Sequence, residues 1–114
     1  MKLTGKCRED FEKWFMSSDV FNLNFLHLQN IQVFDRTKHF YKYPDSMQYG
    51  VYVDFFDSVG IYVMDKHNEV ARRFYYDIST KPMSNDITSE CNLTRPQARN
   101  AAIEKADEIH NSKG

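Results

Sequence analysis

The sequence predicts an α+β protein in which a small antiparallel three-stranded sheet is packed by helices, in the chain order helix, helix, three strands, helix. Three observations favour this class: an amphipathic stretch near the start, short β-rich runs separated by polar turns between residues 61 and 93, and an alanine-lined helix from residue 94 onward. Because 114 residues can build one core but not two, we expect a single domain over residues 1–114.

The first predicted helix begins at Thr4, a residue type favoured at helix N-caps. Cys7, Phe11, Trp14 and Phe15 recur at helical spacing and are predicted to form its buried stripe. Ser17-Ser18-Asp19 ends the pattern.

Residues 20–34 fit both an alternating strand and a short helix, and the sequence leaves both open. The polar run 35–39 indicates a loop, and aromatic residues 40–43 follow it. Pro44 then separates this region from the next predicted helix.

The second predicted helix opens at Asp45, which has capping-box spacing to Gln48. Gly60 stands where a left-handed residue commonly ends a helix. Between them lies a wide apolar face made of Val51, Tyr52, Phe55, Phe56 and Val59.

Strands are predicted over residues 61–64, 70–78 and 86–93, with a polar turn over 65–69 and a breaker over 79–85. The second strand would place Val70, Phe74, Tyr76 and Ile78 on one face.

The last predicted helix carries three agreeing start signals: Thr94 as N-cap, Pro96 in the first turn and Gln97 at the capping-box position. A stripe of small and apolar side chains suits close packing on a sheet; its members are Ala98, Ala101, Ala102, Ala106 and Ile109. The opposite face, with Arg99, Glu104, Lys105 and Glu108, is expected to face water.

Composition favours a protein of the cytoplasm. The formal net charge is −1, so no strong nucleic-acid field arises from charge alone. The two cysteines, Cys7 and Cys91, lack the density of a disulfide scaffold and are expected to be reduced thiols. The sequence shows no apolar run that suits a signal peptide or a membrane span.

Catalytic and metal-binding patterns are weak. Asp54 and Asp57 could approach Asp65 or Glu69 and hold a cation, but solvated carboxylates are the more common outcome, so we expect no metal and no cofactor. The histidines lack zinc-site spacing, Cys91 has no recognisable base, and no Gly-rich phosphate loop is present. We therefore expect a binding protein rather than an enzyme.

Aromatic residues crowd between positions 40 and 56. A single helix in so small a domain is not expected to bury side chains all round, so exposed tyrosines are predicted to form a protein-binding surface. Its members would be Tyr41, Tyr43, Tyr49 and Tyr52, with Asp54 and Asp57 at the rim. Packing of the same tyrosines into the core is the alternative.

Residues 46–60 and 94–106 resemble small uncharacterised proteins carried by phages and prophages of Bacteroides-type bacteria. The resemblance implies a phage or mobile-element origin. Because small phage accessory proteins often mask a host protein, it implies protein binding in the bacterial cytoplasm, including inhibition of a host defence protein.

Residues 98–102 are similar to the start of the final helix of the double-stranded RNA-binding domain. The predicted order from Pro44 onward, helix, three strands, helix, also matches that family. The resemblance implies that Arg95, Arg99 and Lys105 contact phosphates, as an alternative function. Pro96 stands where that family has a lysine, and the family's Gly-rich and Gly-Pro-x-His loop signatures are missing from this sequence. Three or fewer basic contacts would give weak and steeply salt-sensitive binding.

Overall fold

The structure, a computed structural model, describes residues 1–17, 33–80, 87–89 and 94–113. Its elements are α1 (Gly5–Ser17), α3 (Val33–Phe40), α4 (Asp45–Ser58), β1 (Ile61–Asn68), β2 (Arg73–Thr80), β3 (Ile87–Thr88) and α5 (Arg95–Ser112). The predicted α+β class is confirmed. Most of the ambiguous segment 20–34, and Cys91, lie outside the described residues.

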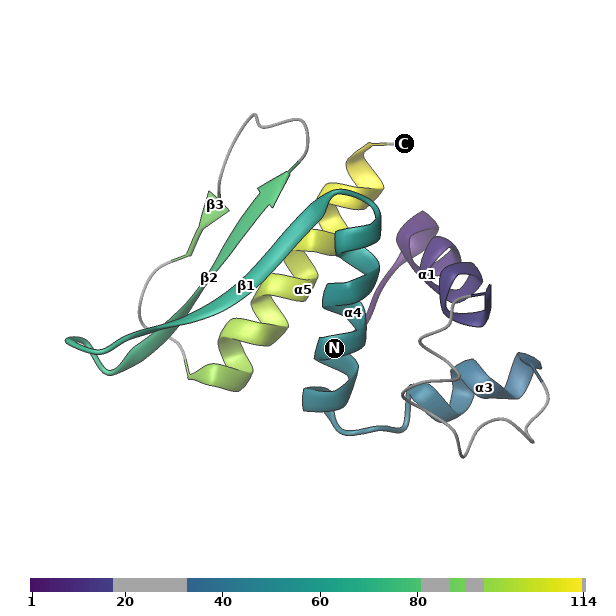
Figure 1. The fold of residues 1–114 in the computed structure, drawn as a ribbon, viewed down its shortest axis with the longest axis horizontal. Coiled ribbons are helices and arrows are strands. Elements are labelled where there is room, and N and C mark those ends of the chain that lie inside the picture. Colours follow the sequence, from purple (N-terminus) through teal and green to yellow (C-terminus); the bar gives the residue numbers. More distant parts are fainter. Residues whose placement is uncertain (18–32, 81–86, 90–93, 114) are drawn as a thin grey trace.

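The sheet is antiparallel with the strand order β1-β2-β3, and α4 and α5 pack on one of its faces (Figure 1). The register pairs Val63 with Ile78 and Asp65 with Tyr76, so these residues share a face. Ile61, Val63 and Ile78 on that face are buried beneath the helices. The opposite, open face carries Tyr62, Met64 and Tyr75 together with polar residues.

The β1–β2 turn lies further along the chain than predicted. The predicted turn at 65–69 is wrong because Lys66 forms an ion pair with Asp77 across the strands, at 2.6 Å, and the strand continues to Asn68. The Asn68 Oδ1 accepts a hydrogen bond from the Ala71 backbone N–H at 3.0 Å, which closes the turn. Val70 consequently stands in the turn, almost fully exposed, instead of on the apolar face.

Of the third strand predicted over residues 86–93, the structure describes residues 87–89, and Ile87–Thr88 form β3. Ile87 and Thr88 pair with Ile78 and Asp77. Beyond Ser89, the remainder of the predicted strand lies outside the described ranges.

For helix α4, the sequence signal for the end of the helix is confirmed, whereas the signal for its start is not. Gly60 adopts φ +80°, as predicted for a residue that ends a helix. The predicted capping box at Asp45 is wrong: Pro44 is the N-cap, and no side chain caps it. The Gln48 amide instead donates to the carbonyl oxygens of Tyr41 and Tyr43, at 3.2 and 2.8 Å, and so fixes the chain that leads into the helix.

Helix α5 follows its sequence signals closely. Thr94 accepts from the Gln97 backbone N–H and Gln97 caps the Thr94 N–H in return, which is the predicted capping box. Ala98, Ala102 and Ala106 are buried, as predicted, and Ile103 joins them. The absence of long side chains on this face lets the helix approach the sheet.

Helices α1 and α3 add a second layer beside α4. The predicted stripe of α1 is confirmed: Cys7, Phe11 and Phe15 are fully buried and Trp14 is partly buried. The predicted loop at 35–39 is wrong, because this run belongs to α3 and packs on α1, with Phe40 fully buried.

Polar contacts tie α1 to the end of α5. The Asp107 carboxylate accepts from the backbone N–H and the hydroxyl of Thr4, at 2.8 and 2.7 Å, and the Asn111 Oδ1 accepts from the Cys7 N–H at 2.9 Å. Asp107 is itself buried, so these bonds satisfy a carboxylate that would otherwise be costly to enclose.

Candidate functional site

Two of the four predicted surface tyrosines lie in the core. Tyr52 has no exposed surface, and its ring meets those of Phe11 and Phe40 at centroid distances of 4.9 and 5.5 Å. Tyr49 is 6% exposed, and the Arg99 guanidinium of α5 lies over its ring. The prediction that these two tyrosines are exposed is therefore wrong. Its physical reason is that α1 and α3 cover one side of α4 while α5 and the sheet cover the other.

Tyr41 and Tyr43 are partly buried and pack against the same core. The Tyr41 hydroxyl is shielded from solvent, without a hydrogen-bond partner in the described part of the chain, and the Arg8 guanidinium lies 5.3 Å from the ring centroid. Burial, assisted by the nearby Glu12 carboxylate, raises the pKa of Tyr41 to about 12.

The predicted acidic rim is on the surface, but it surrounds no tyrosine patch. Asp54 and Asp57 are both exposed on α4. Partial burial and the neighbouring Asp54 raise the pKa of Asp57. Within the described ranges, no three His, Cys, Asp or Glu side chains are placed to hold a metal ion together.

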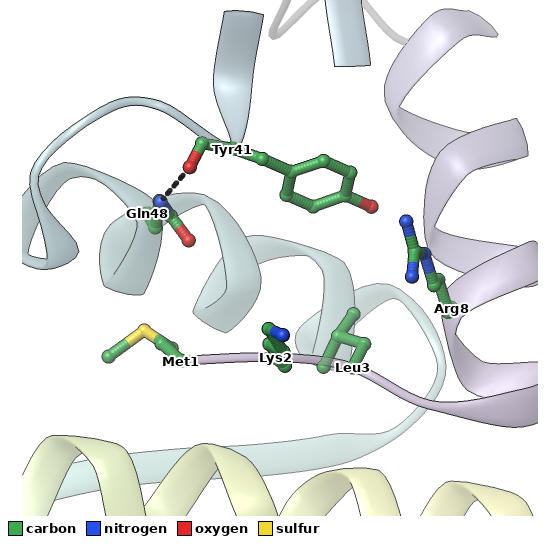
Figure 2. A pocket seen from close by; sticks show the side chains of 6 residues that line it. All are labelled: Met1, Lys2, Leu3, Arg8, Tyr41 and Gln48. Atoms are coloured by element: carbon green, nitrogen blue, oxygen red, sulfur yellow. Dashed lines mark hydrogen bonds between the residues drawn. The ribbon is translucent and has the colours of Figure 1, made fainter. Parts of the chain in front are cut away.

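A hollow of about 230 Å³ lies beside Tyr41 and is lined by Met1, Lys2, Leu3, Arg8, Tyr41 and Gln48. In Figure 2 the Tyr41 ring points toward Arg8, above the segment that carries Lys2 and Leu3. The lining holds two cationic side chains and no carboxylate. The Gln48 amide cannot serve a ligand freely, because its N–H groups are used by two backbone carbonyls.

The predicted phosphate-contacting arginines lie together at the start of α5. Arg95 and Arg99 are one helical turn apart, and both line a second hollow of about 120 Å³, together with Asp45 and Ser46 at the start of α4. Arg95 is exposed, and its guanidinium lies 4.7 Å from the Phe74 ring centroid.

Arg99 is not the water-facing residue that the sequence predicts. Its Nε lies 3.3 Å from the Asp65 Oδ2, and its guanidinium lies 4.8 Å from the Tyr49 ring centroid. Burial first, and the Asp65 carboxylate second, raise the pKa of Tyr49. Arg99 therefore joins α5 to both β1 and α4.

Lys105 does not join the two arginines. Six residues separate it from Arg99, which turns its position by about 240° around the helix axis. Lys105 instead pairs with Glu108 at 3.4 Å. Lys105 therefore lies apart from Arg95 and Arg99 on α5, and its predicted contact with phosphate stays a prediction.

The β1–β2 turn brings further cations to this end of the molecule. Arg72, in a left-handed conformation with φ 55°, and Arg73 are both exposed. Arg73 precedes Phe74, the residue on which Arg95 stacks, and the His67 ring lies 4.7 Å from that of Phe74. These residues were not predicted from the sequence, although an Arg-Arg pair in a hairpin turn is a recognisable signal.

We name this region the arginine end and define it by Arg72, Arg73, Arg95, Arg99 and His67. Arg73 pairs with Asn68 and so belongs to the open face of the sheet, whereas His67 lies on the face that the helices cover. Acidic side chains also lie here: Asp65 pairs with Arg99, and Asp45 lies in the second hollow. The charge of this end is therefore only moderately positive.

Comparisons with models of known protein families, with curated proteins and with solved structures found no match. In the parts of the chain that are described, no helix has the length and apolar character needed to cross a membrane.

Proposed function

We propose that this protein binds double-stranded RNA through the arginine end. The observation that carries the proposal is the order α4-β1-β2-β3-α5, with both helices on one sheet face and the start of α5 beside the β1–β2 hairpin (Figure 1). Duplex RNA is recognised mostly by shape, through contacts to phosphates and 2′-hydroxyls. Cations on two separate elements suit such recognition, because the phosphates of a duplex lie along two strands.

The side chains of this end suit phosphate contacts more than base contacts. Arginine presents several N–H donors in a planar arrangement that matches phosphate oxygens. Arg72, Arg73 and Arg95 are exposed. The resemblance of residues 98–102 to the final helix of the double-stranded RNA-binding domain concerns the same helix that carries Arg95 and Arg99.

The acidic neighbours and the net charge of −1 limit the expected affinity. Three phosphate contacts, one for each exposed arginine, would give a slope of about −2.7 in a plot of log affinity against log salt concentration. Affinity would then fall about 40-fold between 50 and 200 mM salt.

Fluorescence anisotropy with a labelled 20-base-pair RNA duplex tests this proposal. Arg95→Gln should weaken binding at every sequence and make the salt slope shallower by about one unit. Lys105→Gln is the matched control, because it removes the same charge from the same helix on another face, and it should change affinity less than twofold.

Two results would contradict the proposal. One is the absence of any duplex binding at 50 mM salt. The other is equal affinity for RNA and DNA duplexes of one sequence, since recognition by A-form shape and 2′-hydroxyls requires a preference for RNA.

A second candidate function is supported by the open face of the sheet. As an alternative, we propose a non-enzymatic phage or mobile-element accessory protein that binds a host protein, such as a defence protein, through Met64 and Tyr75. Met64 is half exposed, and no described helix packs on this face. Aromatic and methionine side chains are enriched in protein interfaces.

Capture of host proteins by the immobilised chain tests the second candidate. Met64→Asp should abolish capture of a specific partner, whereas Met16→Asp, at an exposed methionine of α1, should not. Equal capture by both variants would contradict this role for the open face.

A further inference from the structure

Arg95 and Arg99 are in different electrostatic states, although both belong to the first turns of α5. The Arg99 Nε lies 3.3 Å from the Asp65 carboxylate, and both side chains are largely shielded, with 27% and 20% of their surface exposed. Arg95 stacks on Phe74 and forms no ion pair within the described part of the chain. A phosphate therefore meets one available guanidinium and one that is already neutralised.

The Asp65 carboxylate and a phosphate would compete for the same cation. Partial burial keeps water and salt ions from screening the Arg99–Asp65 attraction fully. Tyr49 lies under the Arg99 guanidinium at 4.8 Å, so the arginine keeps a packing partner when the acid is neutralised. Loss of the carboxylate charge should thus release the cation without displacing the side chain.

We propose that Asp65 is a built-in competitor that withholds Arg99 from the nucleic-acid backbone and so lowers affinity for duplex RNA. This inference rests on the proposed RNA-binding function. Arg72, Arg73 and Arg95 then make the first phosphate contacts, and Arg99 contributes only where a phosphate approaches closely enough to replace Asp65. The ion pair thereby penalises loosely fitting polyanions more than a close-fitting duplex.

The alternative role for Asp65 is to hold Arg99 in the orientation that a phosphate needs. The two roles predict opposite effects of Asp65→Asn, which keeps the size of the side chain and an oxygen that can accept from the Arg99 Nε. Competition predicts tighter binding, and positioning predicts weaker binding.

The test measures anisotropy of a labelled 20-base-pair RNA duplex with six proteins: wild type, Asp65→Asn, Asp65→Ser, Arg99→Gln, the Asp65→Asn/Arg99→Gln double variant, and Asp57→Asn. Asp57→Asn is the control, because it removes the same charge at the far end of α4. Asp57 lies about 18 Å along the helix axis from Asp45, the α4 residue that lines the hollow beside Arg95 and Arg99. Asp65→Ser provides a second neutral variant, and thermal melting confirms that each protein is folded.

Competition predicts that Asp65→Asn and Asp65→Ser tighten binding about fivefold to tenfold at 100 mM salt. The salt slope should steepen by about 0.9, equivalent to one added phosphate contact. In the Arg99→Gln background Asp65→Asn should change affinity less than twofold, and Asp57→Asn should do the same in the wild-type background.

The inference is overturned if wild type binds the duplex but neutral Asp65 variants weaken binding or leave the salt slope unchanged. It is also overturned if Asp65→Asn gives the same gain without Arg99, because that gain would reflect net charge alone. Absence of duplex binding by the wild type and every variant would instead remove the proposed function itself, and the inference with it.

Discussion

Replacement of Tyr52 by alanine separates a core role from a surface role for the aromatic middle of the chain. Its side chain has no exposed surface, and the ring contacts Phe11 and Phe40 at 4.9 and 5.5 Å. Truncation of a buried aromatic side chain to alanine costs about 3–5 kcal/mol of unfolding free energy. This is a large share of the total stability of a small domain.

The Tyr52 hydroxyl contributes much less, because its bond to the Gln48 Oε1 is long, at 3.4 Å. Tyr52→Phe should therefore cost only about 0.5–1 kcal/mol. Urea unfolding followed through Trp14, the single tryptophan, which lies beside Phe11 and Phe55, measures both changes.

Tyr75→Ala is the matched control for the alanine variant, because Tyr75 lies on the open face of the sheet, and it should cost no more than about 1 kcal/mol. A Tyr52→Ala protein that loses less than about 1 kcal/mol would refute the burial argument.

Three further outcomes are expected. Thr94→Ala should cost about 1 kcal/mol by opening the capping box with Gln97, and Thr94→Ser should restore most of it, as measured by urea unfolding. The His110 Nε2 lies 2.9 Å from the Asp10 Oδ2, and this bond lowers the pKa of Asp10 below its unfolded value. Ionised Asp10 thus stabilises the fold above its unfolded pKa, and this stabilisation should be lost as the pH drops through the lowered folded pKa. In Asp10→Asn, the loss of unfolding free energy at acid pH should be smaller. An Asp10→Asn protein with the same pH profile as the wild type would contradict the role given to the Asp10–His110 contact. The pKa of Tyr41 is raised to about 12 in the folded state, so its phenol stays protonated there when the unfolded chain has begun to ionise. The contribution of Tyr41 to the unfolding free energy should therefore be constant up to the unfolded pKa near 10 and fall between pH 10 and 12. Tyr41→Phe should reduce that alkaline fall.

Local sequence signals were sufficient to predict an element where one short run of residues contains both its start signal and the side chains of its buried face. The capping box of Thr94 and Gln97 and the alanine face of α5 are of this kind, and both are confirmed. Gly60 is another, since a left-handed residue at a helix end depends on local backbone sterics. The fold class followed because such signals occur in most elements.

Long-range contacts explain the errors. The polar run from Asp65 to Asn68 resembles a turn in sequence, yet it continues β1 because Asp77 and Arg99 provide partners for Lys66 and Asp65. Gln48 has capping-box spacing, yet it bonds to carbonyls in the segment before α4. In each case a partner outside the local window decides the conformation, and no propensity scale contains that information.

The candidate site combines both situations, which explains why only two of its five residues, Arg95 and Arg99, were predicted. Arg95 and Arg99 lie one turn apart on a helix whose start is legible, so their proximity follows from spacing alone. Arg72 and Arg73 reach the same end only because the turn begins at Asn68, and Arg95 then meets the neighbouring Phe74. Whether the Arg99 charge is already paired depends on Asp65, which is 34 positions away along the chain. The part of the site that one helix encodes was therefore accessible from sequence, whereas the part that governs its electrostatics required the register of the sheet against α5.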